Sequence, residues 1–139
     1  MIKKILLLTL AVVLLYAAMN HKFLMAMSYL HDNDNSNDAK AVALLNDAIN
    51  NDHDRKSAFL LGYYYKTEKY NNINMKLSHQ NYLKAAQWGD DEAKMIVAWN
   101  FYKGRGCNQD IAQAKELLTQ LSIDGNEKAK EILKFVIRN

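Results

Sequence analysis

A repeat of 36 residues constrains the fold of this 139-residue chain more than any other feature. The matched positions share size or chemistry, and they are Gly89 with Gly125, Tyr65 with Phe101, Asp38 with Asn74 and Asp110, and Ser57 with Ala93 and Ala129. No insertion is needed to keep this register. A fixed period of this length is the signature of stacked supersecondary units, so the sequence predicts a repeat protein.

Each repeat has the pattern of a helix, a loop and a second helix. In the third repeat, Gly104 and Gly106 permit the positive φ angles of a loop, Asp110 can cap the next helix, and Gly125 can end it. The predicted second helices are Asp38 to Asn50, Met75 to Trp88 and Ile111 to Ile123. Residues Glu127 to Ile137 contain only a first helix, which suits the open end of a solenoid. The absence of proline also favours helix.

These residues resemble a known family of helical repeats. The segments Leu61-Gly62-x-x-Tyr65, Gly104-x-Gly106, Asp110 and Lys84-Ala85-Ala86-x-x-Gly89 are similar to the Sel-one-like repeat, a relative of the tetratricopeptide repeat. The resemblance covers about residues 21 to 137. It implies an all-α, right-handed α-solenoid of about three helix-loop-helix repeats plus a C-terminal capping helix.

The chain departs from the family pattern at two loops. The middle repeat has Glu68 and Tyr70 where the family has glycines, so its loop is expected to differ in shape. In the third repeat, Cys107 replaces the expected Val. Some exported members of the family join each repeat with a disulfide, and a single cysteine excludes that here.

The N-terminus has the pattern of an export signal. Lys3 and Lys4 precede a largely apolar run from Ile5 to Met19, which predicts a hydrophobic helix and a periplasmic location for residues 20–139. Residues 1–19 are therefore interpreted as a signal peptide or a membrane anchor. The small residues Ala17 and Ala18 match a cleavage site poorly, while fifteen residues are short of the ~20 that span a bilayer. A removed signal and an anchor in the inner membrane both stay open.

The sequence contains no recognisable metal or nucleic-acid site. The net charge of +3 is too small to indicate nucleic-acid binding, and one cysteine excludes a cysteine-based zinc site. The four histidines show no metal-binding spacing. Asp32, Asp34 and Ser36 occupy the first three ligand positions of a calcium loop, but Ala43 stands where the bidentate Glu belongs. A solvated loop is the preferred interpretation, and no metal or cofactor is predicted.

No catalytic constellation is recognisable either. Asp90, Asp91 and Glu92 form an acidic run that is expected to complement the dipole of a helix N-terminus. The serines lie in no nucleophile elbow. Cys107 is either a reactive thiol or, as we prefer, a small apolar substitute in a repeat loop. We therefore predict no catalytic residues.

An aromatic stripe is the most informative candidate for binding. Tyr63, Tyr64 and Tyr65 spread over roughly 200° of a helix, so they cannot all face one core. Tyr64 and Tyr65 share the stripe of Leu61, whereas Tyr63 lies opposite. In tetratricopeptide-like solenoids, the matching positions line a concave groove. The predicted partner-binding residues are Phe59, Tyr63, Lys66, Met95, Trp99 and Tyr102. Aromatic residues and Met are enriched at protein interfaces, although the same stripe would also serve as core between repeats.

These observations favour a non-catalytic, exported protein-binding module. By resemblance, small exported family members include immunity proteins that inhibit phospholipase effectors of rival bacteria, so a toxic effector is the expected partner. The alternatives are an envelope adaptor or regulator and, less favoured, an enzyme that binds or hydrolyses β-lactams. Charge is also unevenly distributed, since residues 32–54 contain six Asp and only Lys40, whereas residues 55–84 are basic. This asymmetry either orients a partner or marks two solvated faces.

Overall fold

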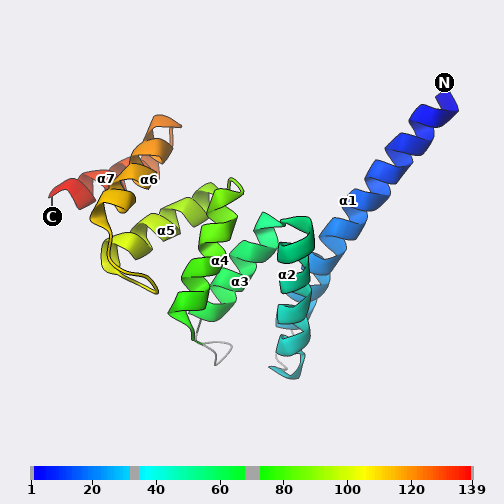
Figure 1. Ribbon diagram of the computed structural model, residues 1–139, viewed down its shortest axis with the longest axis horizontal. Coiled ribbons are helices and arrows are strands. Elements are labelled where there is room, and N and C mark those ends of the chain that lie inside the picture. The colour runs from blue at the N-terminus through cyan, green and yellow to red at the C-terminus, as the bar shows by residue number, and fades with distance from the viewer. Residues whose placement is uncertain (1, 32–34, 68–72, 139) are drawn as a thin grey trace. The chain divides into compact units, whose positions relative to one another are not determined.

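A computed structural model describes residues 2–31, 35–67 and 73–138, and these are helical throughout apart from their connections (Figure 1). The elements are α1 (Ile2–His31), the 3-10 helix η1 (Asn35–Asn37), α2 (Asp38–Asp52), α3 (Arg55–Lys66), α4 (Met75–Gln87), α5 (Asp91–Lys103), α6 (Ile111–Ile123) and α7 (Glu127–Arg138). No strand occurs within these ranges, so the predicted all-α class is confirmed. The chain divides into two compact units, Met1–Ser57 and Ala58–Asn139.

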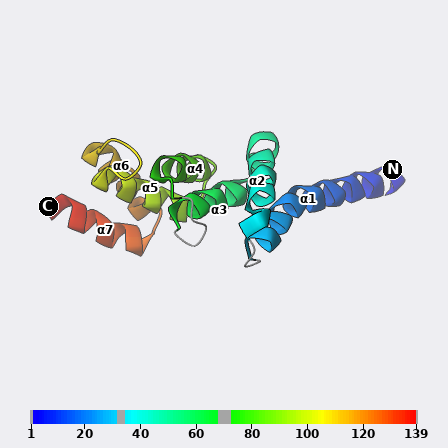
Figure 2. The same cartoon turned by 90° about the horizontal axis from the view of Figure 1, so that it is seen from below.

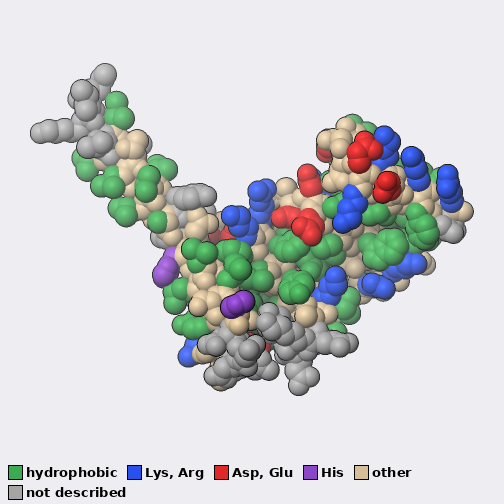
Figure 3. Space-filling view, turned by 180° about the vertical axis from the view of Figure 1, so that it is seen from behind, with side chains coloured by type: hydrophobic (Ala, Val, Ile, Leu, Met, Phe, Trp, Pro, Cys, Tyr) green, Lys and Arg blue, Asp and Glu red, His purple; other side chains and the backbone are tan. Residues whose placement is uncertain are grey.

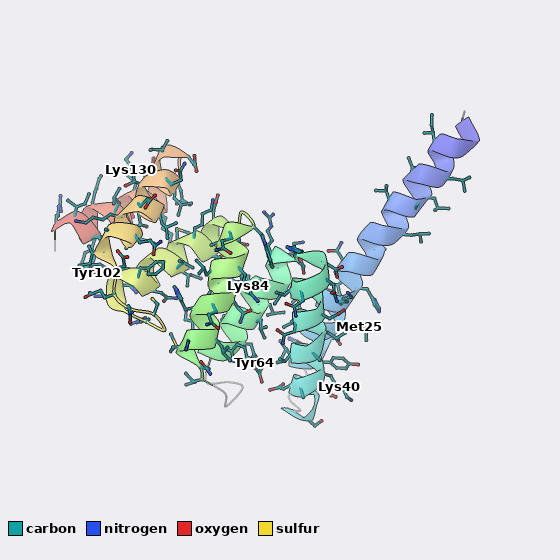
Figure 4. The ribbon with its side chains drawn as sticks, in the orientation of Figure 1. Met25, Lys40, Tyr64, Lys84, Tyr102 and Lys130 are labelled. Carbon is teal, nitrogen blue, oxygen red and sulfur yellow. The ribbon has the colours of Figure 1, made fainter. Side chains whose placement is uncertain are left out.

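The N-terminal unit pairs the second half of α1 with α2. Ala26 and Leu30 on α1 and Leu45 on α2 are buried, and Met25 lies on the same part of α1 (Figure 4). The Lys22 ammonium bridges two carboxylates of α2, at 2.6 Å from Asp47 and 2.8 Å from Asp52. The acidic run noted in the sequence is therefore partly neutralised within its own unit.

The first half of α1 continues the same helix without interruption. Its apolar side chains, such as Leu7, Leu10 and Val13, are exposed. Among the described residues, no helix has both the length and the apolar character needed to cross a membrane. The boundary predicted after residue 19 falls inside α1. The interpretation of residues 1–19 as a signal peptide or anchor stays a prediction.

The C-terminal unit stacks its helices in chain order. Each of α4, α5 and α6 packs against the helix that follows it. In Figure 2, α4 and α6 form one layer of this unit, and α3, α5 and α7 form the other. The buried core that joins α5, α6 and α7 consists of Ala98, Leu118, Leu121, Ala129 and Val136. This sequential stacking is the arrangement expected of a helical repeat protein.

Helix caps recur at the 36-residue period and confirm the repeat register. Asp54, Asp90 and Asn126 lie 36 residues apart, and their side chains accept hydrogen bonds from the backbone N–H groups three residues later at 3.1, 2.8 and 3.0 Å. Asn74 and Asp110 cap α4 and α6 in the same way, at 3.0 and 2.9 Å. Each side chain satisfies an N–H group that the first turn of a helix leaves without a partner.

The connections between repeats share a residue with a positive φ angle. His53, Gly89 and Gly125, again 36 residues apart, all have positive φ angles, of 50°, 89° and 91°. A left-handed residue at this position ends the preceding helix. Within the repeats, the Asn74 N–H donates to the Tyr65 carbonyl and the Asp110 N–H to the Phe101 carbonyl, at 2.8 and 2.9 Å. The predicted left-handed end at Gly125 is therefore confirmed.

The predicted helices agree closely with the structure. α6 spans the predicted residues, α4 ends one residue earlier than predicted, α2 extends two residues further, and α7 extends one further. Glu68 and Tyr70, which replace the family glycines, lie outside the described residues. Asp32 and Asp34 of the acidic loop also lie outside them.

Candidate protein-binding surface

Helix α5 carries two partly exposed aromatic rings beside its buried face. Asp90 starts the helix as its N-cap, and Val97 and Ala98 are fully buried. Trp99 and Tyr102 are instead partly exposed, with Tyr102 near the C-terminal end of α5 (Figure 4). Tyr102 and Met95 also pack against the core shared by α5, α6 and α7. Helix periodicity thus gives α5 both a buried face and an aromatic outer face.

Three aromatic rings from α5 and α7 form one cluster, which we call the aromatic surface: Trp99, Tyr102 and Phe135. The Trp99 centroid lies 5.5 Å from that of Tyr102 and 6.1 Å from that of Phe135, and the Tyr102 and Phe135 centroids are 6.1 Å apart. These separations are in the range of favourable aromatic pairs. The cluster therefore fixes the relative positions of rings from two helices.

A cation covers one side of the aromatic surface. The Lys103 ammonium lies 5.2 Å from the Trp99 ring centroid and 4.7 Å from that of Tyr102. Both distances are within the range of cation–π attraction. Lys103 itself is exposed. It thus places a positive charge at the edge of the surface.

An open pocket lies beside the rings. It has a volume of about 280 Å³ and is lined by Trp99, Glu131, Ile132 and Phe135. Three of the four lining residues are apolar, and Glu131 is exposed. Phe135 retains 46% of its accessible surface although it contacts the other rings. Apolar surface is therefore available to a second molecule at this point.

The structure separates the six residues predicted to bind a partner. It brings Trp99 and Tyr102 together on the aromatic surface, with Met95 half-buried against the adjoining core. Phe59 instead packs edge-on against Tyr82 of α4, with centroids 5.2 Å apart, so its ring takes part in packing between α3 and α4. Tyr63 and Lys66 are exposed on α3.

Phe135 was missed by the sequence analysis, although the repeat register contains it. Trp99 lies 36 residues after Tyr63, and Phe135 lies 36 residues after Trp99. The predicted stripe ended at the third repeat, and α7 was expected only to cap the solenoid. Had the same register been continued, it would have placed an aromatic residue on α7 beside Trp99.

The fan of three tyrosines on α3 is confirmed. Leu61 and Tyr64 are buried, and the Tyr64 ring contacts Tyr65 edge-on at 5.2 Å. Tyr63 points away from this side and is 45% exposed. One helix therefore supplies both core and surface aromatics.

Among the described residues of the C-terminal unit, the titratable groups show no activated nucleophile or acid pair. Burial raises the pKa of the Cys107 thiol, which disfavours the reactive thiolate. Asp90 caps α5, and Asp91 pairs with Lys94 at 2.9 Å, so this acidic run acts at the helix start as expected. No group of residues that could hold a metal ion occurs in the described part of the chain.

Two other buried groups have pKa values displaced mainly by burial. The pKa of Tyr82 is raised by burial first, and then by the nearby Tyr63 and Glu92. The pKa of His79 is lowered by burial. The His79 ring packs edge-on against Phe101 at 5.0 Å, and its Nδ1 lies 3.4 Å from the Asn100 side-chain nitrogen. Both groups are held neutral in the packing between helices.

Comparison with known proteins identifies the type of fold. No family model matches the chain. No curated protein matches it either. Among solved structures, the crystal structure of a Sel1 repeat protein from Oxalobacter formigenes is similar, with a TM-score of 0.71 and 28% identity over 92% of this chain and 96% of that chain. The chain has the fold of a Sel1 repeat protein.

This similarity confirms the predicted resemblance to Sel1-like repeats and the predicted helical solenoid. Helical repeat arrays of this kind provide extended surfaces for binding other proteins. The fold is therefore that of a protein-interaction scaffold, and it suggests a role in binding rather than catalysis.

Proposed function

We propose that this Sel1-like repeat chain is an exported protein-binding module whose partner docks on the aromatic surface. One observation carries the proposal: Trp99, Tyr102 and Phe135 form a ring cluster that remains partly exposed next to an apolar pocket. Partly exposed aromatic residues held rigidly by their neighbours are typical of interface hot spots.

The repeat register supports the same surface. Tyr63, Trp99 and Phe135 occupy equivalent positions on α3, α5 and α7, and these helices form one layer of the C-terminal unit (Figure 2). Core packing alone does not explain the exposure of Tyr63 and Phe135. An interaction surface that crosses several repeats does explain it.

The finer proposal is that the partner is a toxic effector, such as a phospholipase, and that the chain inhibits it as an immunity protein in the periplasm. The export pattern of residues 1–19 supports the location, and the Sel1-like fold supports the mode of action. An envelope adaptor would use the same surface without inhibiting an enzyme.

The test is capture of a partner followed by an enzyme assay. The full chain carrying a C-terminal tag is incubated in mild detergent with envelope extract and secreted proteins of the native host. We expect it to retain one enzyme in stoichiometric amount and to inhibit that enzyme. Retention of a resident envelope protein without inhibition would support the adaptor instead.

Matched variants show whether the aromatic surface is responsible. Phe135→Ala and Trp99→Ala should abolish capture, whereas Ile123→Ala should not, because Ile123 is an exposed apolar residue on α6 outside the pocket. Thermal melts identify any variant that has lost its fold. Equal capture by folded Phe135→Ala and by the parent chain would contradict the proposed surface.

A further inference from the structure

We propose that the pocket beside the aromatic surface receives one large apolar side chain from an acidic segment of the protein partner. The inference rests on the proposed function and adds the chemistry of the partner. It depends on two properties of the site, which are the size of the pocket and the charge around it.

The pocket is small, open and lined mainly by apolar side chains, so it has room for one large apolar side chain. Its volume of about 280 Å³ lies just below the range of roughly 300–1,000 Å³ that is typical of small-molecule sites. Trp99, Ile132 and Phe135 form apolar walls, and Glu131 is the one charged residue in the lining. A small polar ligand would find few groups to fix its orientation. A Leu, Met or Phe side chain needs only the apolar walls.

Basic side chains outnumber the two carboxylates of α7 near the pocket, Glu131 and Glu127, and Glu127 is already paired with Lys130 at 3.4 Å. On α7, Lys128 and Arg138 are exposed and lie three residues before Glu131 and three residues after Phe135. Residues three and four apart share one face of a helix. Lys103 adds a third cation from α5, above the rings. In Figure 3, Lys and Arg side chains, with some Asp and Glu among them, border the hydrophobic side chains on the C-terminal helices.

This charge arrangement favours a partner segment with negative charge. Complementary charges around an apolar anchor increase the association rate and exclude wrong partners. A partner segment whose basic side chain paired with Glu131 would bring that positive charge close to three cations of this chain, which would repel it. An acidic segment would instead place its carboxylates near Lys103, Lys128 and Arg138 while its apolar residue fills the pocket.

Selection from a random peptide library tests this chemistry without knowledge of the natural partner. Twelve-residue peptides displayed on phage are selected on the full chain, and the enriched peptides are synthesised with a fluorescent label for anisotropy titrations. We expect sequences with one large apolar residue flanked by Asp or Glu. Their affinity should fall as salt is raised from 50 to 300 mM, because exposed charges are screened.

Variants connect the selected peptides to the site. Phe135→Ala should weaken binding about tenfold or more, as expected for loss of an anchor pocket. The double reversal Lys103→Glu with Arg138→Glu should weaken it by a similar factor, about tenfold. Lys76→Glu changes the same charge on an exposed residue of α4, and Ile123→Ala removes an exposed apolar side chain elsewhere. Both controls should bind like the parent chain.

Several outcomes would overturn the inference. Enrichment of basic peptides that lose binding in Glu131→Gln would show that the pocket selects the opposite charge. Peptides that bind Phe135→Ala equally well, or a selection without pocket-dependent peptides, would show that the pocket is not the anchor. Binding to phosphatidylglycerol vesicles through Lys103 and Arg138, with no such peptides, would assign the cations to lipid.

The outcomes also separate this inference from the proposed function. If a protein is captured through Phe135 but binds the double reversal Lys103→Glu with Arg138→Glu normally, only the acidic character of the partner is wrong. If capture is independent of Phe135, the proposed surface itself is wrong.

Discussion

The middle and third repeats share the same helix cap and the same backbone hydrogen bond between helices but fill their cores differently. Asn74 and Asp110 make the same cap and close the same hydrogen bond between helices. In the middle repeat, the buried ring of Tyr82 lies against Gly62, where an added Cβ would come within 3.0 Å of it. The equivalent pair in the third repeat is Leu118 and Ala98.

This difference shows which part of the repeat is interchangeable. A large ring facing a glycine and a leucine facing an alanine fill similar space, so volume has moved from one helix to the other. Well-packed cores accept such exchanges when total volume is kept. The caps and the backbone bonds do not vary in this way, because only a few residue types can satisfy the helix ends.

The largest expected effect comes from breaking the loop of the third repeat with Gly106→Ala. Gly106 has a φ of +72°, and an added Cβ would overlap the Met75 carbonyl oxygen. We expect a loss of about 3 kcal/mol or more in the free energy of unfolding, from backbone displacement and left-handed strain together. Urea denaturation followed by circular dichroism measures it.

Gly125→Ala is the matched control for that substitution. Its φ is +91°, but no atom lies within 4 Å of the added Cβ. Only the left-handed strain of about 1–2 kcal/mol should therefore appear. Equal losses at the two glycines would show that the contact between Gly106 and Met75 is unimportant.

A double-mutant cycle would convert the core of the middle repeat into that of the third. Tyr82→Leu alone should cost about 2 kcal/mol because it leaves a cavity beside Gly62. Adding Gly62→Ala should recover about 1 kcal/mol, because the new methyl group occupies part of that space and alanine favours helix. The coupling is read from the unfolding free energies of the four proteins. A coupling near zero would contradict the proposed exchange of volume.

A smaller effect should come from His53, which extends the comparison to the first repeat. His53 adopts a φ of 50° at the position that Gly89 and Gly125 occupy in the other repeats. His53→Gly should raise the free energy of unfolding by about 0.5–1 kcal/mol, since glycine relieves the left-handed strain at the cost of some chain entropy. His53→Ala serves as the control and should bring no gain. A loss in His53→Gly would show that side-chain contacts of His53 outweigh the strain.

The smallest effect is expected from pH, and it distinguishes His79 from Lys115, its equivalent in the third repeat. Burial lowers the pKa of His79, so the folded state favours the neutral ring. The unfolded chain takes up the proton at a pKa of about 6.5. The contribution of His79 to the free energy of unfolding should therefore decrease as pH falls below that value, until the ring is protonated in the folded protein too. Above that value, this contribution should be constant.

Comparing the parent chain with His79→Leu isolates this contribution from the other histidines. The difference between their unfolding free energies is measured from pH 7.5 to 5.5. We expect the parent chain to lose more stability than the variant over this interval. Parallel pH profiles would mean that His79 is not held neutral by the fold.

Local chemistry explains why so much of the fold was predictable. The cap at Asp110 and the left-handed end at Gly125 each depend on a single residue type at a fixed position, so the 36-residue spacing was enough to predict them. His53 was not recognised as their equivalent because histidine, unlike glycine, adopts that conformation only uncommonly. Its backbone is held there by the preceding helix, whose Ala48 carbonyl accepts its N–H.

The site was predicted less well because a helical stripe does not reveal what lies across from it. Phe59 shares a stripe with Tyr63, yet Gly62 leaves room for Tyr82 to approach α3, and Phe59 packs against that ring. Beside Trp99, the pocket required three residues from another helix, Glu131, Ile132 and Phe135 of α7. Its formation depends on the packing of α7 against α6, which periodicity alone does not specify.

The two carboxylates on α2 that pair with Lys22 lie within the part of the chain that follows residue 19. A chain processed after residue 19 would still carry Lys22 as its third residue, with Asp47 and Asp52 intact to hold it. The shortened α1 would also keep Ala26 and Leu30 in their buried positions. The ion pairs of Lys22 therefore hold α1 against α2 from a position just after residue 19, so the first repeat keeps these contacts whether or not residues 1–19 are removed.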